Sequence, residues 1–252
     1  IGARSTVNPF TVQEIAVALK GTNKPVLVKN PVNPDLALWI GALERLLGQD
    51  VKNLGVIHRG FSSYQKTKYR NLPNWQIALD FKHQYPNIPM FVDPSHICGR
   101  RDLLSDVTQE AFNVGYEGAM IESHCNPDAA WSDAAQQITP EVLAEMLGNL
   151  QIRNSDISGF DEEMGKHRAL ISDIDFQLIE LLSNRMKISE KIGALKKENN
   201  IAIFQPDRWK VIAEYASARA EESGMGKDFI EKVFKAIHEE SIEVQNNIMI
   251  DK

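Results

Sequence analysis

The hydrophobic pattern changes near residue 155, and this change constrains the fold of the 252-residue chain more than any other feature. Before it, short apolar runs alternate with helical patterns at a spacing of roughly 29–35 residues, which is typical of βα units. Short runs that are apolar throughout are typical of buried parallel strands. The expected strands are residues 25–29, 54–57, 88–92 and 118–121. We therefore expect a parallel α/β architecture in the first part.

From about residue 160 the strand pattern disappears, and apolar residues recur at helical spacing. Acidic residues at 161–163 suit the start of a long helix, and Asn199-Asn200 suit its end. The three expected helices cover about 161–199, 206–223 and 228–247. Residues 151–159 form the expected linker, so the predicted domains are 1–150 and 160–252.

Composition narrows the classes of protein that the chain can belong to. The 28 lysines and arginines against 34 acidic residues leave a net charge of −6, which argues against nucleic-acid binding. No apolar run reaches the roughly 18 residues that a membrane helix needs, and the opening Ile1-Gly2-Ala3-Arg4 is unlike a signal peptide. Two cysteines, Cys98 and Cys125, are expected to be reduced thiols. These features predict a cytoplasmic protein.

Polar side chains follow each expected strand directly. They include Lys29, His58-Arg59, Asp93 to His96 and Glu122 to His124. In parallel α/β folds the active site forms at the carboxyl ends of the strands. A set of His, Glu and Asp suits a divalent metal such as Mn, Fe, Co or Zn. On composition alone, hydrogen bonds within the loops explain these residues equally well.

Cations on the first long helix are spaced for a shared site. Arg185 and Lys196 are 11 residues apart, which places them on one face about 16 Å apart. Arg168 precedes Arg185 by 17 residues, or about 25 Å, and faces roughly 100° away. It cannot join the same site within one chain, but it could join the site of a second chain. A solvated surface is the alternative interpretation of such cations.

Five strings of apolar and polar residues follow one another through the helical part. They are Arg168-x-x-Ile171-x-x-Ile174-Asp175, Leu181-Leu182-x-x-Arg185, Ile192-Gly193-x-x-Lys196, Pro206-Asp207-Arg208 and Ser241-x-x-x-Gln245. Over about residues 160–250 this pattern resembles the all-helical class of chorismate mutase. The resemblance implies a three-helix domain that forms an intertwined homodimer through its long helices.

The resemblance also implies the roles of individual residues. Arg185 and the Arg168 of a second chain would clamp the two carboxylates of chorismate in its reactive conformer. Lys196 and Gln245 would donate to the ether oxygen, where negative charge develops on the way to prephenate. The residues implied to assist substrate binding are Arg208 and Ser241. The rearrangement is unimolecular, so no cofactor is expected for it.

Two positions depart from the chorismate mutase pattern. Trp209 stands where the family commonly has a glutamate that contacts the substrate hydroxyl. Gln205 stands at another position that is commonly acidic, and it could substitute in binding the substrate. An alternative function for the helical part is therefore a regulatory and dimerisation module that senses prephenate or chorismate.

The α/β part carries its own set of strings. They are Ile1-Gly2-Ala3-Arg4, Pro25-Val26-Leu27-Val28-Lys29, Arg59-Gly60, Asp93-Pro94-Ser95-His96, Gly99-Arg100-Arg101-Asp102, Ile121-Glu122 and Ser132-Asp133. They resemble type I 3-deoxy-D-arabino-heptulosonate 7-phosphate (DAHP) synthase, of the subgroup close to octulosonate synthases. This implies metal ligands, which are His96, Glu122 and Asp133, and phosphoenolpyruvate contacts, which are Arg4, Lys29 and Arg59. The implied second substrate is erythrose 4-phosphate, whose aldehyde the metal polarises.

The resemblance begins at the fourth strand of the family's eight-stranded barrel. We therefore expect an amino-terminally incomplete (β/α)8 barrel, without the strand that carries the family's cysteine ligand. Cys98 and Cys125 do not match that cysteine, and His58 is not expected to be a ligand. An octulosonate-type sugar-acid synthase remains the alternative for this part.

Together the two resemblances indicate a bifunctional enzyme of the shikimate pathway of aromatic amino acid biosynthesis. A complete barrel would condense phosphoenolpyruvate with erythrose 4-phosphate, and the helical part would convert chorismate to prephenate. The expected assembly is a homodimer through the helical domain, or a higher oligomer. Such a fusion also suggests allosteric regulation of the barrel by a ligand in the helical part.

Overall fold

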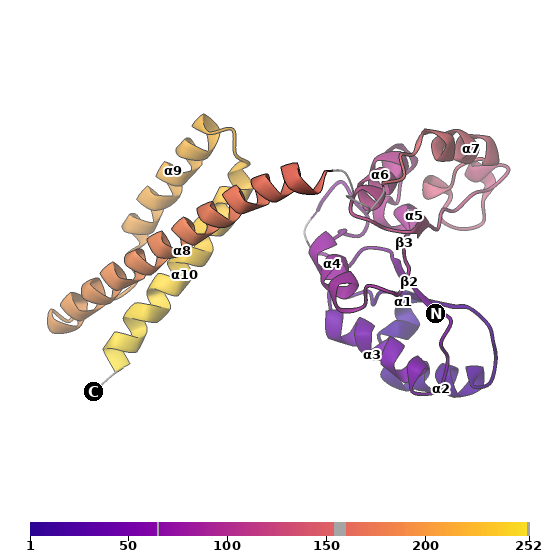
Figure 1. Ribbon diagram of the computed structural model, residues 1–252, viewed down its shortest axis with the longest axis horizontal. Helices are drawn as coiled ribbons and strands as arrows, with labels where there is room; N and C mark the ends of the chain where they lie inside the picture. Colours follow the sequence, from indigo (N-terminus) through magenta and orange to yellow (C-terminus); the bar gives the residue numbers. More distant parts are fainter. Residues whose placement is uncertain (65, 154–159, 251–252) are drawn as a thin grey trace. The chain divides into compact units, whose positions relative to one another are not determined.

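The computed structural model describes residues 1–64, 66–153 and 160–250. The chain divides into two compact units, Ile1–Asp156 and Ile157–Lys252, and each is described by itself (Figure 1). Of the expected linker, residues 154–159 lie outside the described part. The first unit is α/β and the second contains three helices.

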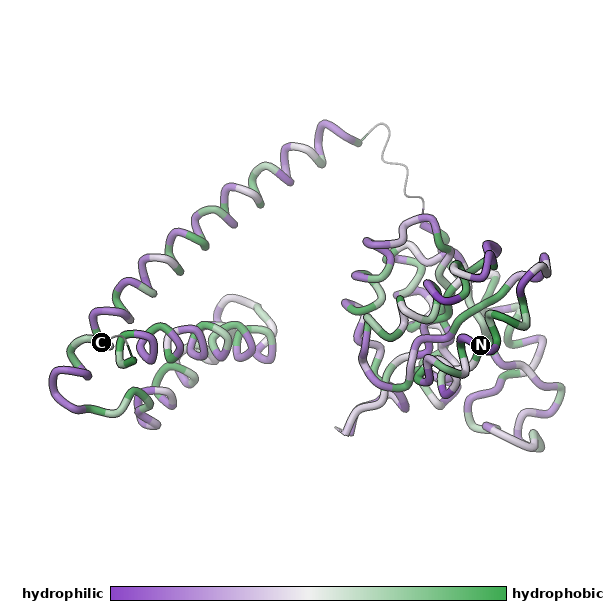
Figure 2. Tube along the Cα trace, turned by 90° about the horizontal axis from the view of Figure 1, so that it is seen from below, coloured by the Kyte–Doolittle hydropathy of each residue, from purple (hydrophilic) through white to green (hydrophobic). Residues whose placement is uncertain are grey.

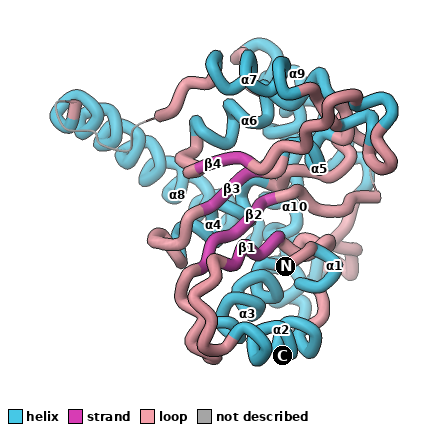
Figure 3. Tube along the Cα trace, turned by 90° about the vertical axis from the view of Figure 1, so that its right-hand side faces the viewer, coloured by secondary structure: helices cyan, strands magenta, loops and turns pink. Residues whose placement is uncertain are grey.

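The first unit is built on a four-stranded parallel sheet whose order follows the chain (Figure 3). Its strands are β1 (Val26–Lys29), β2 (Leu54–His58), β3 (Met90–Val92) and β4 (Gly118–Ala119). Val56 aligns with Val28 on one side and Met90 on the other, and Val92 aligns with Ala119. This order of neighbouring parallel strands with a helix between successive strands is also that of a (β/α)8 barrel.

Helices precede, connect and follow the strands, and several begin at a side chain that caps them. They are α1 (Ala3–Thr6), α2 (Pro9–Leu19), α3 (Leu36–Leu47), α4 (Trp75–Gln84), α5 (Pro94–Cys98), α6 (Leu104–Asn113) and α7 (Pro140–Asn149), with 3-10 turns η1 (Arg101–Leu103), η2 (Pro127–Ala129) and η3 (Ala134–Gln136). Asn8 accepts hydrogen bonds from Phe10 N and Thr11 N at the start of α2, and Asp35 accepts from Leu38 N at the start of α3. Such caps satisfy backbone donors that a helix start leaves free.

One hydrophobic core joins the strands to helices α2, α3, α4 and α6. Trp39 of α3 is completely buried, and its ring lies 4.7 Å from that of Phe81 of α4. Val56 and Met90, from neighbouring strands, are also completely buried. The core therefore holds the strand ends, and the polar residues that follow them, in a defined arrangement.

His58 belongs to this core. The Pro73 carbonyl can only accept, so His58 Nε2 carries the ring proton and donates to Pro73 O at 2.6 Å, and Nδ1 accepts from the Tyr116 hydroxyl at 2.9 Å. Burial lowers the pKa of His58 to about 4, an effect that the Pro73 carbonyl and the Asp93 charge oppose. Because both ring nitrogens are in use, His58 is a structural residue and is unavailable as a metal ligand.

The second unit contains α8 (Asp161–Glu198), α9 (Pro206–Glu222) and α10 (Lys227–Ile250). Helix α10 packs along α8 and α9. The two helices α8 and α10 approach closely at Gly193, where an added Cβ would lie 3.1 Å from Gln245 Cα. These bounds agree with the helices expected from the sequence to within a few residues. In the described part of the chain, no helix is long and apolar enough to cross a membrane.

Helix α8 exposes most of its apolar side chains, which recur along it (Figure 2). Those between residues 170 and 182 are Leu170, Ile171, Ile174, Phe176, Leu178, Ile179, Leu181 and Leu182. The buried apolar cluster of this unit is small and centres on Ala216, Ala220 and Ile230. An exposed apolar surface of this kind is typical of a protein interface.

Candidate functional sites

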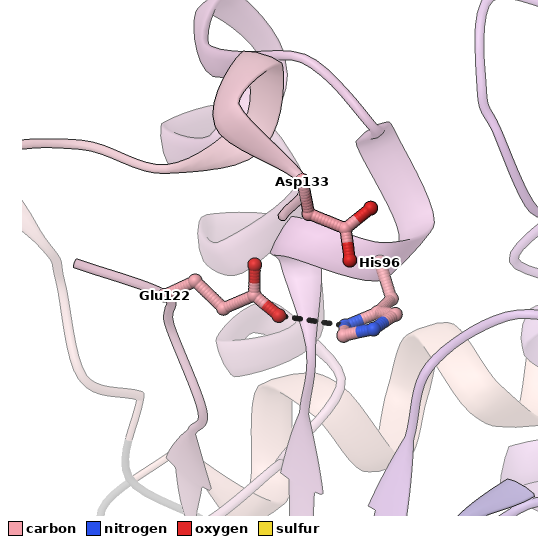
Figure 4. A group of neighbouring side chains, drawn as sticks. All are labelled: His96, Glu122 and Asp133. Atoms are coloured by element: carbon pink, nitrogen blue, oxygen red, sulfur yellow. Dashed lines mark ion pairs between the residues drawn. The ribbon is translucent and has the colours of Figure 1, made fainter. Parts of the chain in front are cut away.

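Three potential metal ligands converge at the carboxyl ends of two strands (Figure 4). His96 lies in α5 just after β3, Glu122 follows β4, and Asp133 ends the next loop. Each offers one ligand atom, and these atoms all lie within 4.8 Å of one another. An imidazole with two carboxylates suits a divalent transition metal, so this donor set fits such an ion.

Asp93 orients His96. Its carboxylate accepts from His96 N at 3.0 Å, which caps α5, and lies 2.9 Å from His96 Nδ1. Lys29 Nζ pairs with the same carboxylate at 2.7 Å. Burial raises the pKa of Asp93, but His96 and Lys29 outweigh burial and hold it below its usual value. The anionic Asp93 thus fixes the His96 ring, whose Nδ1 also lies 3.6 Å from Glu122 Oε1, as partners of metal-binding histidines do.

Gln136 and Arg70 form a second layer of contacts around the carboxylates. Gln136 is 1% exposed, and its Nε2 donates to Glu122 Oε2 at 2.9 Å. Arg70 Nη1 donates to Gln136 Oε1 and to Asp133 Oδ1, both at 2.7 Å. The hydrogen bond from Arg70 lowers the pKa of Asp133, which keeps that carboxylate ionised. Metal ligands must be deprotonated, and Asp133 is held in that form.

Gly99 makes room for Arg70. It ends α5 with a left-handed φ of +66°, and an added Cβ would lie 2.6 Å from Arg70 Cβ. A residue with a side chain would be strained in this conformation and would also collide with Arg70. The turn after His96 therefore depends on glycine.

The three cations expected to contact phosphoenolpyruvate also lie at this edge of the sheet. Arg59 N donates to Asn30 Oδ1 at 2.7 Å, and Arg59 Nη1 donates to Asn71 Oδ1 at 3.0 Å. Burial lowers the pKa of Arg59, Asp93 opposes this, and the nearby charges of Arg70 and Arg4 lower it further. Mutual repulsion of this kind marks a place where an anion would be stabilised.

The second unit contains a cavity of about 360 Å³ between its three helices. It gathers six of the side chains selected from the sequence, which are Arg185, Lys196, Gln205, Arg208, Ser241 and Gln245. Arg168 does not line it and is exposed on α8. The structure therefore brings together the residues that one chain can supply and leaves Arg168 outside, as the helix geometry requires.

Hydrogen bonds orient the polar groups of this cavity. Arg185 Nη1 donates to Ser241 Oγ, and Ser241 Oγ donates to Ile237 O at 2.8 Å. Lys196 Nζ donates to Ile203 O at 2.6 Å. Burial lowers the pKa of Arg185, and the charge of Arg208 adds to this effect. The cavity is thus a concentration of positive charge that suits an anionic ligand.

Residues 1–157 match the DAHP synthetase I family, and residues 167–246 match chorismate mutase type II. The chain belongs to the DAHP synthetase I family. The expected fold, a partial barrel followed by an all-α domain, is confirmed, and so is the fusion of these two enzyme domains.

Individual relatives each match part of the chain. Phospho-2-dehydro-3-deoxyheptonate aldolase of Thermotoga maritima is 28% identical over 151 residues, which are 60% of this chain and 43% of the relative. T-protein of Haemophilus influenzae is 28% identical over 87 residues, which are 34% of this chain and 23% of that protein. The chain spans less than half the length of these relatives.

A solved structure is also similar to this chain. It is a truncated form of 3-deoxy-D-arabino-heptulosonate 7-phosphate synthase from Thermotoga maritima, with 28% sequence identity and a TM-score of 0.52. The similarity covers 59% of this chain and 54% of that chain.

Some residues that form these two sites were not predicted from the sequence. Arg70 and Gln136 lie in segments without a strand or helix pattern, so no spacing signal marks them. His238 lines the helical cavity, and its ring stacks on that of Trp209. A signal for His238 exists, because it precedes Ser241 by three residues and Gln245 by seven, which places all three on one helix face.

Proposed function

We propose that the helical unit converts chorismate to prephenate. The observation that carries this proposal is the cavity in which Arg185, Lys196 and Arg208 surround Ser241 and Gln245. The reaction breaks one carbon–oxygen bond and forms one carbon–carbon bond within a single molecule, so it needs no nucleophile or base. What it needs is a folded conformer and stabilisation of charge on the departing ether oxygen.

The polar side chains of the cavity would hold the folded conformer and stabilise the charge on the ether oxygen. Arg185 is held by Ser241 and would bind one carboxylate with its guanidinium. Lys196 would exchange its bond to Ile203 O for a bond to the ether oxygen, and Gln245 would add a second donor there. Arg208 and Gln205 would complete the binding of the ligand.

We further propose that the active assembly is a dimer. Arg168 lies outside the cavity of its own chain, and the apolar residues around it on α8 are exposed. A second copy of the chain would cover this surface and bring its own Arg168 to the cavity. The α8 helix of a second copy would therefore both cover the apolar residues and supply the missing arginine.

The mutase proposal is tested by the rate of chorismate disappearance. Lys196→Ala should lower kcat by roughly 10²-fold or more, as removal of an oxyanion donor does. Lys191→Ala removes an exposed lysine of the same helix and should leave kcat unchanged. Near-normal turnover by Lys196→Ala would contradict its role, and no turnover by the unaltered chain would contradict the function.

For the α/β unit we propose the condensation of phosphoenolpyruvate with erythrose 4-phosphate in a complete barrel. DAHP synthases are generally metal-dependent, and His96, Glu122 and Asp133 would hold the ion. When bound, the metal would polarise the aldehyde as a Lewis acid. Lys29, Arg4 and Arg59 would bind the phosphate and carboxylate of phosphoenolpyruvate.

The synthase proposal is tested in the same chain with and without the strands that complete the family's barrel. The described residues supply four strands, so we expect product formation only when the barrel is closed. A parallel assay replaces erythrose 4-phosphate with arabinose 5-phosphate. Preference for the five-carbon sugar would favour an octulosonate-type synthase instead.

A further inference from the structure

The cations of the helical cavity suit carboxylates, but they do not account for the binding of an uncharged hydroxyl. Arg185, Lys196 and Arg208 line it, and none of the described residues that line it is acidic. These cations suit the carboxylates of a ligand. An uncharged hydroxyl of the same ligand needs a neutral hydrogen-bonding partner, because a buried hydroxyl without one is costly.

Two atoms in this cavity lack the partners that buried polar atoms normally have. Across residues 1–64, 66–153 and 160–250, the buried side-chain atoms without a hydrogen-bond partner are His238 Nε2 and Gln245 Oε1. Both residues line the cavity. Gln245 Nε2 donates to Ser241 O at 3.1 Å, which leaves Oε1 as an acceptor. Two such atoms in one cavity indicate that a ligand completes the hydrogen bonding.

The His238 ring is held in place by aromatic neighbours. It stacks on Trp209 with 4.4 Å between ring centroids and 19° between planes. Phe204 lies 6.1 Å away on another side. A ring fixed in this way loses little conformational freedom when it contacts a ligand.

Burial and the surrounding cations favour the neutral imidazole. Helix α8 contributes Arg185 and Lys196, α9 contributes Arg208, and Glu239 is adjacent on α10. Burial lowers the pKa of His238, Arg185 and Lys196 lower it further, and Glu239 opposes them. A neutral imidazole offers one donor and one acceptor, which suits a hydroxyl group.

We propose that His238 determines which dicarboxylates the cavity accepts, by forming a hydrogen bond with an uncharged hydroxyl of the ligand. Trp209 is the positioning residue, because it holds the imidazole by stacking. The identity of the ligand rests on the proposed mutase function, since chorismate carries two carboxylates and one ring hydroxyl. Trp209 then supports a hydroxyl contact made by His238, in place of the contact that the family's glutamate makes.

The test compares two ligands that differ in this hydroxyl, chorismate and 4-deoxychorismate. Their affinities are measured with the full chain, from the KM of chorismate turnover and from the inhibition of that turnover by 4-deoxychorismate. His238→Leu should weaken chorismate binding roughly tenfold or more and leave 4-deoxychorismate within about twofold, because one hydrogen bond to a buried group is lost. His238→Gln, which keeps a donor and an acceptor, should recover part of the discrimination.

Variants of Trp209 separate positioning from contact. Trp209→Phe keeps a ring for stacking and should keep the discrimination between the two ligands, whereas Trp209→Ala should reduce it. Glu239→Gln changes an exposed neighbour on the same helix and should behave as the unaltered chain at pH 8. Melting temperatures identify any variant whose fold is damaged.

The outcomes distinguish this inference from the proposed function. Equal losses for both ligands in His238→Leu would show that His238 only shapes the cavity and would overturn the inference. Unchanged discrimination in that variant would also overturn it, while normal chorismate turnover would leave the mutase function intact. If the unaltered chain neither binds nor converts chorismate, both fail.

Discussion

Replacing Gln136 by methionine is expected to weaken metal binding without disturbing the sheet. Gln136 is buried, and its amide joins the carboxylate of Glu122 to the guanidinium of Arg70. Methionine has a similar length and volume but cannot replace either hydrogen bond. Glu122 then loses the donor that orients it, and Arg70 keeps only its bond to Asp133.

The size of the effect follows from these two contacts. Loss of a group that orients metal ligands typically lowers metal affinity about 10–100-fold. This range corresponds to about 1.4–2.8 kcal/mol, since each tenfold change is about 1.4 kcal/mol. The value is consistent with the roughly 1.5–3 kcal/mol that a hydrogen bond to a charged group contributes.

Calorimetric titration with Mn²⁺, carried out on the protein with a complete barrel, measures the affinity directly and does not depend on catalysis. Gln76→Leu removes an exposed glutamine of α4 and serves as the matched control. Glu122→Gln should abolish most of the binding and shows that the ion occupies this cluster. If Gln136→Met binds Mn²⁺ within twofold of the unaltered chain, the positioning role is wrong. If Glu122→Gln binds normally, the cluster is not the site.

Three further predictions concern stability, assembly and regulation. The pKa of His58 is about 4 in the folded chain and 6.5 ordinarily, so the unfolded chain takes up a proton first as pH falls. Urea unfolding should therefore show a loss of stability between about pH 6.5 and 4, by up to roughly 3 kcal/mol. His58→Gln should flatten this loss. Mixing Arg168→Ala with Arg185→Ala chains should restore some mutase activity, and no recovery despite verified subunit exchange would refute shared sites. In the protein with a complete barrel, prephenate should change synthase activity by a coupling of about 1–3 kcal/mol, and a response that survives Arg185→Ala would place the effector elsewhere.

The order of strands and helices was predictable because hydrophobic periodicity is a local property. Residues 54–57 read as a buried strand, and β2 covers Leu54–His58. Asn199 read as a helix end, and α8 stops at Glu198. Helix spacing likewise predicted that Arg185 and Lys196 share a site and that Arg168 does not.

The contacts between residues far apart in the chain needed the tertiary structure. Arg70 and Gln136 are separated by 66 residues, and they meet because the connections that follow β2 and β4 lie at the same edge of the sheet. Trp209 read as a departure from the chorismate mutase pattern, yet in the structure it supports the ring of His238. The sequence determined the elements and the faces of its helices, since these depend on neighbours a few residues away. Packing decided which side chain orients which ligand, because that depends on how separate elements fit together.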